Sequence, residues 1–87
     1  GMSNALYSGI TFKNGAVEQS NFTDYNVARM SNYPKKVSVH IVDAPHGTHS
    51  GGIGEPAVAP MIAALCNAVF AASKKRLRSL PAGDKIA

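Results

Sequence analysis

One stretch decides the fold of this chain: residues 56–72, PAVAPMIAALCNAVFAA. Apolar side chains recur in it at helical spacing and form a single stripe. They are Val58, Met61, Ile62, Leu65, Cys66, Val69 and Phe70. The alanines between them have high helix propensity, and Pro56 and Pro60 are tolerated only in or before a first turn. The pattern predicts a helix that Lys74–Arg78 close and Pro81 ends, with Cys66 as a small buried thiol.

Toward the N-terminus, residues 6–22 are typical of a β-hairpin. Asn14-Gly15 suits a type I′ turn, because both central residues of that turn need positive φ. A two-residue loop pairs Phe12 with Val17 and Ile10 with Gln19. The apolar members of these pairs then share one face of the hairpin.

Between the hairpin and the helix, residues 35–43 alternate in the manner of another strand. Residues 21–34 are irregular, and residues 44–54 form a loop. The sequence therefore predicts the α+β class: a small antiparallel β-sheet, the N-terminal hairpin plus one or two strands, packed across its apolar face by one C-terminal α-helix. We expect a single small domain over residues 1–87, with residues 82–87 as a loose tail.

Charge and cysteine content exclude several classes of function. The net charge is +4, and much of it lies in Lys74, Lys75, Arg76 and Arg78. A solvated helix end accounts for this cluster better than a nucleic-acid or lipid patch, because no aromatic side chains interleave it. Cys66 is the only cysteine, which rules out an intrachain disulfide and an iron–sulfur cluster. No apolar run reaches the roughly 20 residues of a membrane span, so we expect no membrane partner. No basic start followed by an apolar run marks a signal peptide, so we expect a cytoplasmic location, with a periplasmic parent subunit as the open alternative.

The segment that carries chemistry is Ser50-Gly51-Gly52-Ile53-Gly54-Glu55-Pro56, directly before the helix. Three glycines in four residues allow positive φ and a close approach to a bulky partner. The helix start favours an anion, and Glu55 places a carboxylate there. A simple turn with a dipole-compensating acid would give the same pattern. The spacing is neither a Walker loop nor a dinucleotide fingerprint.

Several blocks together resemble one enzyme family. Gly52-Ile53-Gly54-Glu55-Pro56, residues 67–72 (NAVFAA) and residues 75–81 (KRLRSLP) resemble the end of the molybdenum-binding subunit of the xanthine oxidase and aldehyde oxidase family. Residues 5–12 (ALYSGITF), 17–22 (VEQSNF) and 39–42 (VHIV) are most similar to its isoquinoline 1-oxidoreductase branch. The resemblance covers nearly the whole chain, with the blocks in order.

The resemblance implies a molybdenum hydroxylase that inserts a water-derived oxygen into an N-heteroaromatic or aldehyde substrate. Glu55 matches the family's general base beside the molybdenum, and Gly51, Gly52, Ile53 and Gly54 match residues that bind the cofactor. That cofactor is molybdenum with molybdopterin cytosine dinucleotide. Electrons leave through a partner subunit or domain that carries [2Fe-2S] clusters.

Family subunits are many times longer than 87 residues. We therefore expect the isolated chain to be inactive, to hold no cofactor and to need the remainder of the molybdenum subunit. The alternative is a truncated, non-catalytic relic or self-associating module. Gly1 before Met2 resembles a protease scar ahead of a native start, which favours a short natural reading frame. Open strand edges and the helix stripe predict a homo-oligomer.

Histidines raise one more possibility. His46 and His49 lie in the predicted loop, and His40 and Asp43 lie in the strand predicted before it. Their spacing fits no defined zinc pattern, so solvated side chains are the expected state and no metal site is assigned.

Overall fold

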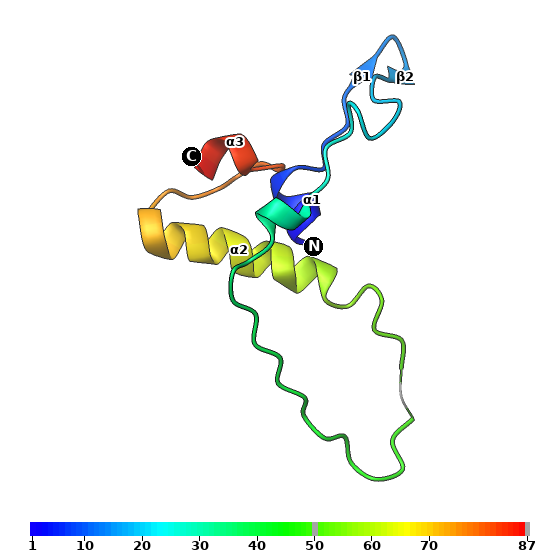
Figure 1. Cartoon of the computed structure of the whole chain (residues 1–87), viewed down its shortest axis with the longest axis vertical. Coiled ribbons are helices and arrows are strands. Elements are labelled where there is room, and N and C mark those ends of the chain that lie inside the picture. The colour runs from blue at the N-terminus through cyan, green and yellow to red at the C-terminus, as the bar shows by residue number, and fades with distance from the viewer. Residues whose placement is uncertain (50, 87) are drawn as a thin grey trace.

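The computed structural model describes residues 1–49 and 51–86. Its elements follow one another in the order α1 (Met2–Leu6), β1 (Phe12–Lys13), β2 (Ala16–Val17), the 3-10 helix η1 (Met30–Asn32), α2 (Val58–Ser73) and α3 (Gly83–Ile86), as Figure 1 shows. The two strands form an antiparallel sheet. A small antiparallel sheet with one longer C-terminal helix confirms the predicted α+β class.

The longest element, α2, has the predicted stripe. Every apolar side chain of that stripe is half-buried, whereas the alanines and Asn67 between them are exposed. The helix ends earlier than predicted, at Ser73. Lys74 adopts the left-handed conformation, with φ 59° and ψ 5°, and its N–H donates to the carbonyl of Phe70 over 2.8 Å. Because this αL cap satisfies the last turn, Lys75–Arg78 lie beyond the helix and do not close it.

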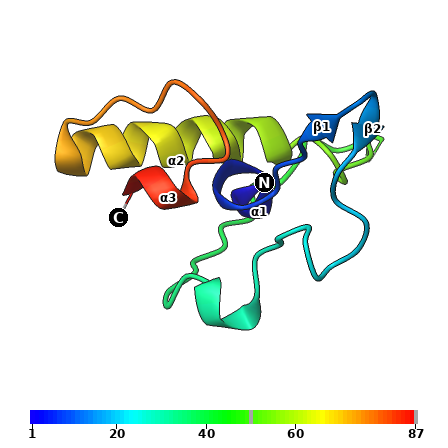
Figure 2. The same cartoon turned by 90° about the horizontal axis from the view of Figure 1, so that it is seen from above.

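The stripe packs against α1, and α3 packs against α1 in turn (Figure 2). Ala5 and Ala82 are fully buried where these segments meet, and the N–H of Ala82 donates to the carbonyl of Ala5 over 2.8 Å. The loose tail expected from residue 82 onward is thus wrong for the described residues 82–86. The prediction that α2 packs across the sheet is also wrong, because α2 packs against α1.

The hairpin has the predicted register. Phe12 pairs with Val17 and Lys13 with Ala16, while Asn14 and Gly15 have φ of 52° and 78°. The strands are short, however, and the expected pair of Ile10 and Gln19 lies outside them. The hairpin projects from the helices (Figure 1), so Phe12 is 67% exposed.

A long arm, residues 33–57, runs out from η1 and returns to α2 (Figure 1). The strand predicted over residues 35–43 is wrong, since the described part of the arm contains no strand. Its residues 35–43 form no backbone hydrogen bond with any described residue. A strand requires a partner, and the short hairpin does not supply one.

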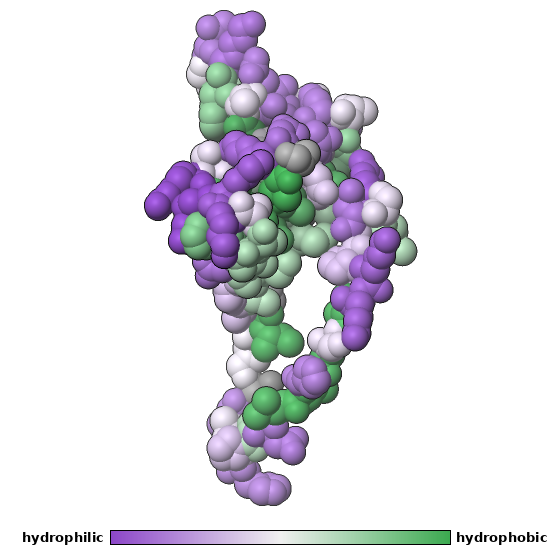
Figure 3. All heavy atoms as spheres, turned by 90° about the vertical axis from the view of Figure 1, so that its left-hand side faces the viewer, coloured by the Kyte–Doolittle hydropathy of each residue, from purple (hydrophilic) through white to green (hydrophobic). Residues whose placement is uncertain are grey.

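The chain is therefore open. Its Cα radius of gyration is 16.6 Å, whereas a compact domain of this length has one of about 12 Å. It exposes 7497 Å² of surface, against about 4,900 Å² for a compact monomer of this mass. Figure 3 shows apolar residues lying open along the arm. About 2,600 Å² of surface is thus available for contact with further polypeptide.

Candidate functional site

The glycine-rich segment forms one side of an open hollow at the start of α2. The hollow has a volume of about 600 Å³ and is lined by Gly52, Gly54, Glu55, Pro56 and Ala59. The structure therefore brings Glu55 together with two of the glycines that the sequence singled out. Gly51 and Ile53 do not line the hollow, and Ile53 is 85% exposed.

Glu55 lies just before the helix. Its backbone carbonyl accepts a hydrogen bond from the N–H of Val58 over 2.9 Å, and this turn leads directly into α2. Its side chain is exposed, and the carboxylate forms no hydrogen bond or ion pair with any described residue. Ala57, the N-cap, supplies no side-chain bond, the N–H of Val58 is already engaged and Pro60 has no N–H. Ala59 therefore carries the one N–H of the first turn that has no partner among the described residues. A carboxylate beside this turn that bonds no described residue is available to accept a proton from a neighbouring molecule.

The glycines provide space. A Cβ added at Gly51, Gly52 or Gly54 would meet no heavy atom within 4 Å. None of the three has positive φ, so the expectation that they supply left-handed conformations is wrong. What glycine contributes here is open space where a side chain would otherwise lie, into which a bulky partner can come close.

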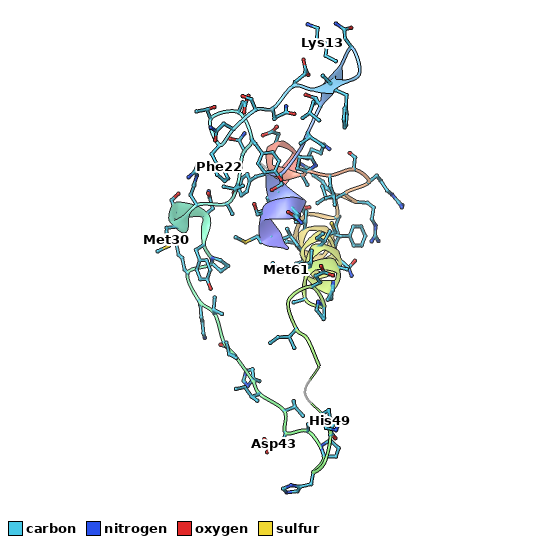
Figure 4. The ribbon with its side chains drawn as sticks, turned by 90° about the vertical axis from the view of Figure 1, so that its right-hand side faces the viewer. Lys13, Phe22, Met30, Asp43, His49 and Met61 are labelled. Carbon is cyan, nitrogen blue, oxygen red and sulfur yellow. The ribbon has the colours of Figure 1, made fainter. Side chains whose placement is uncertain are left out.

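The other candidate residues are scattered. His40, Asp43, His46 and His49 are all exposed in the arm, and Figure 4 shows Asp43 and His49 at its far end. Within residues 1–49 and 51–86, no three His, Cys, Asp or Glu side chains lie close enough to hold a metal ion together. Cys66 lies on the α2 stripe as expected, but its thiol is half-buried and not buried as the sequence predicted.

One polar cluster was not predicted from the sequence. The carboxylate of Asp24 accepts the N–H groups of Ser20 over 3.0 Å and Asn21 over 2.9 Å. The bonds from Asn21 and then Ser20 lower the pKa of Asp24, because they stabilise its charged form. The signal was the Ser-Asn-x-x-Asp spacing of a side-chain-stabilised turn. The same turn forms a second hollow, of about 400 Å³, with Ile10, Phe22 and Tyr25; Figure 4 labels Phe22.

No helix in the described part of the chain has the length and apolar character needed to cross a bilayer.

Comparisons with known proteins add no relative. No protein-family model, no curated protein and no solved structure matches this chain. The candidate site therefore rests on its residues, on their arrangement before α2 and on the resemblance in the sequence blocks.

Proposed function

We propose that this chain is the C-terminal part of the molybdenum-binding subunit of a cytoplasmic molybdenum hydroxylase, and that Glu55 is its general base. The substrate class is an N-heteroaromatic compound or an aldehyde, hydroxylated with oxygen from water. One observation carries the proposal: the Glu55 carboxylate, which bonds no described residue, lies at the start of a helix beside glycines that leave open space where side chains would be.

The residues fit one wall of a site for molybdopterin cytosine dinucleotide. Gly51, Gly52, Ile53 and Gly54 would contact the cofactor, and no side chain at the glycines obstructs such an approach. The remainder of the subunit would hold most of the cofactor. When bound, the cofactor takes up the electron pair that the substrate loses.

Within that reaction, Glu55 has one task. Its carboxylate accepts the proton from the water whose oxygen is transferred to the substrate, at a distance of about 2.6–3.2 Å. The N-terminal end of the α2 dipole lies beside this carboxylate. The glycines leave room for the substrate and the cofactor to lie beside it.

The large exposed surface supports the proposal that this chain is one piece of a larger assembly. About 2,600 Å² beyond that of a compact monomer is an amount that extensive protein interfaces bury. The remainder of the molybdenum subunit would cover part of this surface, and a [2Fe-2S] subunit would receive the electrons.

Co-expression with a molybdenum subunit that lacks this region, together with its [2Fe-2S] partner, tests the proposal. The wild-type chain should restore activity, and Glu55→Gln should lower kcat by about 10²–10⁴-fold with unchanged molybdenum content. Glu18→Gln is the matched control, because Glu18 is an exposed glutamate on the hairpin side of the molecule. Near-normal turnover of the Glu55→Gln enzyme would contradict the assignment of the base.

The second candidate is a non-catalytic, self-associating module, which the open arm favours. Failure of the chain to copurify with any molybdenum subunit, together with self-association, would select this alternative. A neighbouring gene for a subunit that lacks this C-terminus would select the enzyme.

A further inference from the structure

The part of the arm over residues 35–43, KKVSVHIVD, is a strand sequence without a sheet. Its alternating apolar side chains are open to solvent: Val37 is 55% exposed, Val39 79% and Ile41 89%. None of its residues has positive φ, and its backbone donors and acceptors are unpaired among the described residues. Such a segment is a template for pairing with another strand.

Prolines set the length of this segment. Pro34 precedes it and Pro45 follows it closely. Proline has no N–H to donate to a ladder, and it is therefore confined to strand ends and edges. The pairing unit is thus residues 35–43, centred on Val39.

The sequence of this unit complements itself in antiparallel orientation. When two copies cross at Val39, Lys35 of one lies opposite Asp43 of the other, and Val37 lies opposite Ile41. Val39 then meets its own counterpart on the two-fold axis. Both ends of the ladder carry an opposite-charge pair, and the centre is aliphatic, the combination that stabilises neighbouring strands.

Other registers lose this match. A shift that centres the pair on Ser38 places Lys35 opposite Ile41, and a shift to His40 places Asp43 opposite Val37. Both of these registers keep the aliphatic side chains on one face, so the charge pairs decide between them and the register centred on Val39. A register centred between two residues turns the aliphatic set of one copy to the other face, because side chains alternate between faces. Charge and apolar pattern together select the register centred on Val39.

We propose that two copies of this chain associate through residues 35–43, as an antiparallel strand pair with Val39 on the two-fold axis. The pairing satisfies backbone groups that are otherwise unbonded in the arm and covers part of the surface that the open chain exposes. It goes beyond the enzymatic proposal and does not depend on it, since Glu55 lies outside the paired segment.

Cysteine cross-linking tests the register in a Cys66→Ala background. Facing residues of an antiparallel pair have Cα atoms about 4.5–5.5 Å apart, within the span of a disulfide. Val39→Cys should therefore give a covalent dimer on mild oxidation. Ile41→Cys is the matched control: its own counterpart lies about 13 Å further along the ladder, and it should stay monomeric on a denaturing gel. A mixture of Val37→Cys and Ile41→Cys chains should cross-link as a heterodimer. Equal cross-linking of both single variants, or none at Val39→Cys, would overturn the proposal.

Charge reversal tests the same interface without covalent chemistry. In sedimentation equilibrium, Asp43→Lys should raise the dimer dissociation constant about tenfold, because two attractive pairs become repulsive. Lys35→Asp should weaken the dimer in the same way, and the double variant Lys35→Asp/Asp43→Lys should recover wild-type association. A wild-type chain that is monomeric throughout the micromolar range would refute the proposal. A double variant that dimerises no more tightly than either single variant would also refute it. So would the finding that residues 35–43 pair only with a larger subunit.

Discussion

Substitution of Gly83 by alanine should lower the free energy of unfolding, although it adds only one methyl group and alanine favours helices. Gly83 begins α3, and a Cβ at this position would lie 2.6 Å from the carbonyl oxygen of Leu6 in α1. That distance is shorter than any ordinary contact, and the atom it meets is backbone, which cannot turn aside. The added methyl group must therefore push α3 away from α1.

The size of the loss in unfolding free energy follows from the contacts that this displacement strains. Overpacking of a tight contact costs about 1–3 kcal/mol. The neighbouring bond from the N–H of Ala82 to the carbonyl of Ala5, 2.8 Å long, lies at the same junction and contributes about 1 kcal/mol. The higher helix propensity of alanine returns at most about 1 kcal/mol. The free energy of unfolding should fall by about 1–3 kcal/mol, which in a domain of this size lowers Tm by roughly 4–24 °C.

Urea unfolding followed by circular dichroism at 222 nm, at one fixed protein concentration, measures this loss. Gly52→Ala is the matched control, because a Cβ there meets no heavy atom within 4 Å and the backbone has no positive φ. Its free energy of unfolding should stay within about 0.5 kcal/mol of wild type. Equal stabilities of the two variants would show that α3 does not rest against α1.

The remaining predictions concern a carboxylate, a cation and the metal content. The carboxyl group of Asp24 should titrate by NMR below the ordinary aspartate range, because the N–H groups of Asn21 and Ser20 stabilise its charge. Because the pKa of Asp24 is lower in the folded than in the unfolded chain, its charge should stabilise the fold above the unfolded pKa. That stability should be lost as pH falls through the folded pKa, and Asp24→Asn should remove this pH dependence. Arg76 lies 3.8 Å from the centroid of the Phe70 ring, so Arg76→Ala should cost about 0.5–1 kcal/mol in urea unfolding, and an unchanged midpoint would refute the contact. The purified chain alone should contain no molybdenum by elemental analysis, because the described residues offer no cluster of metal ligands; stoichiometric molybdenum would contradict a role as one wall of the site.

The local sequence pattern by itself determined the helix α2, the turn of the hairpin and the place of the candidate site. The spacing of apolar residues from Val58 to Phe70 identified α2 and its half-buried stripe, since helical periodicity depends only on nearby residues. Asn14-Gly15 likewise fixed the turn and register of the hairpin, because positive φ at both positions is a property of the turn itself. The segment before α2, with Glu55 beside glycines, was also visible in the sequence, although its catalytic role stays a prediction.

Only the tertiary structure decided what each element packs against. Residues 35–43 have the alternation of a strand, yet a strand exists only where a second backbone pairs with it, and among the described residues none does. The stripe of α2 found its partner in α1, not in the sheet, and Ala82 anchored a segment whose composition gave no sign of burial. Such choices depend on contacts between residues far apart in sequence, which periodicity within a short window does not encode.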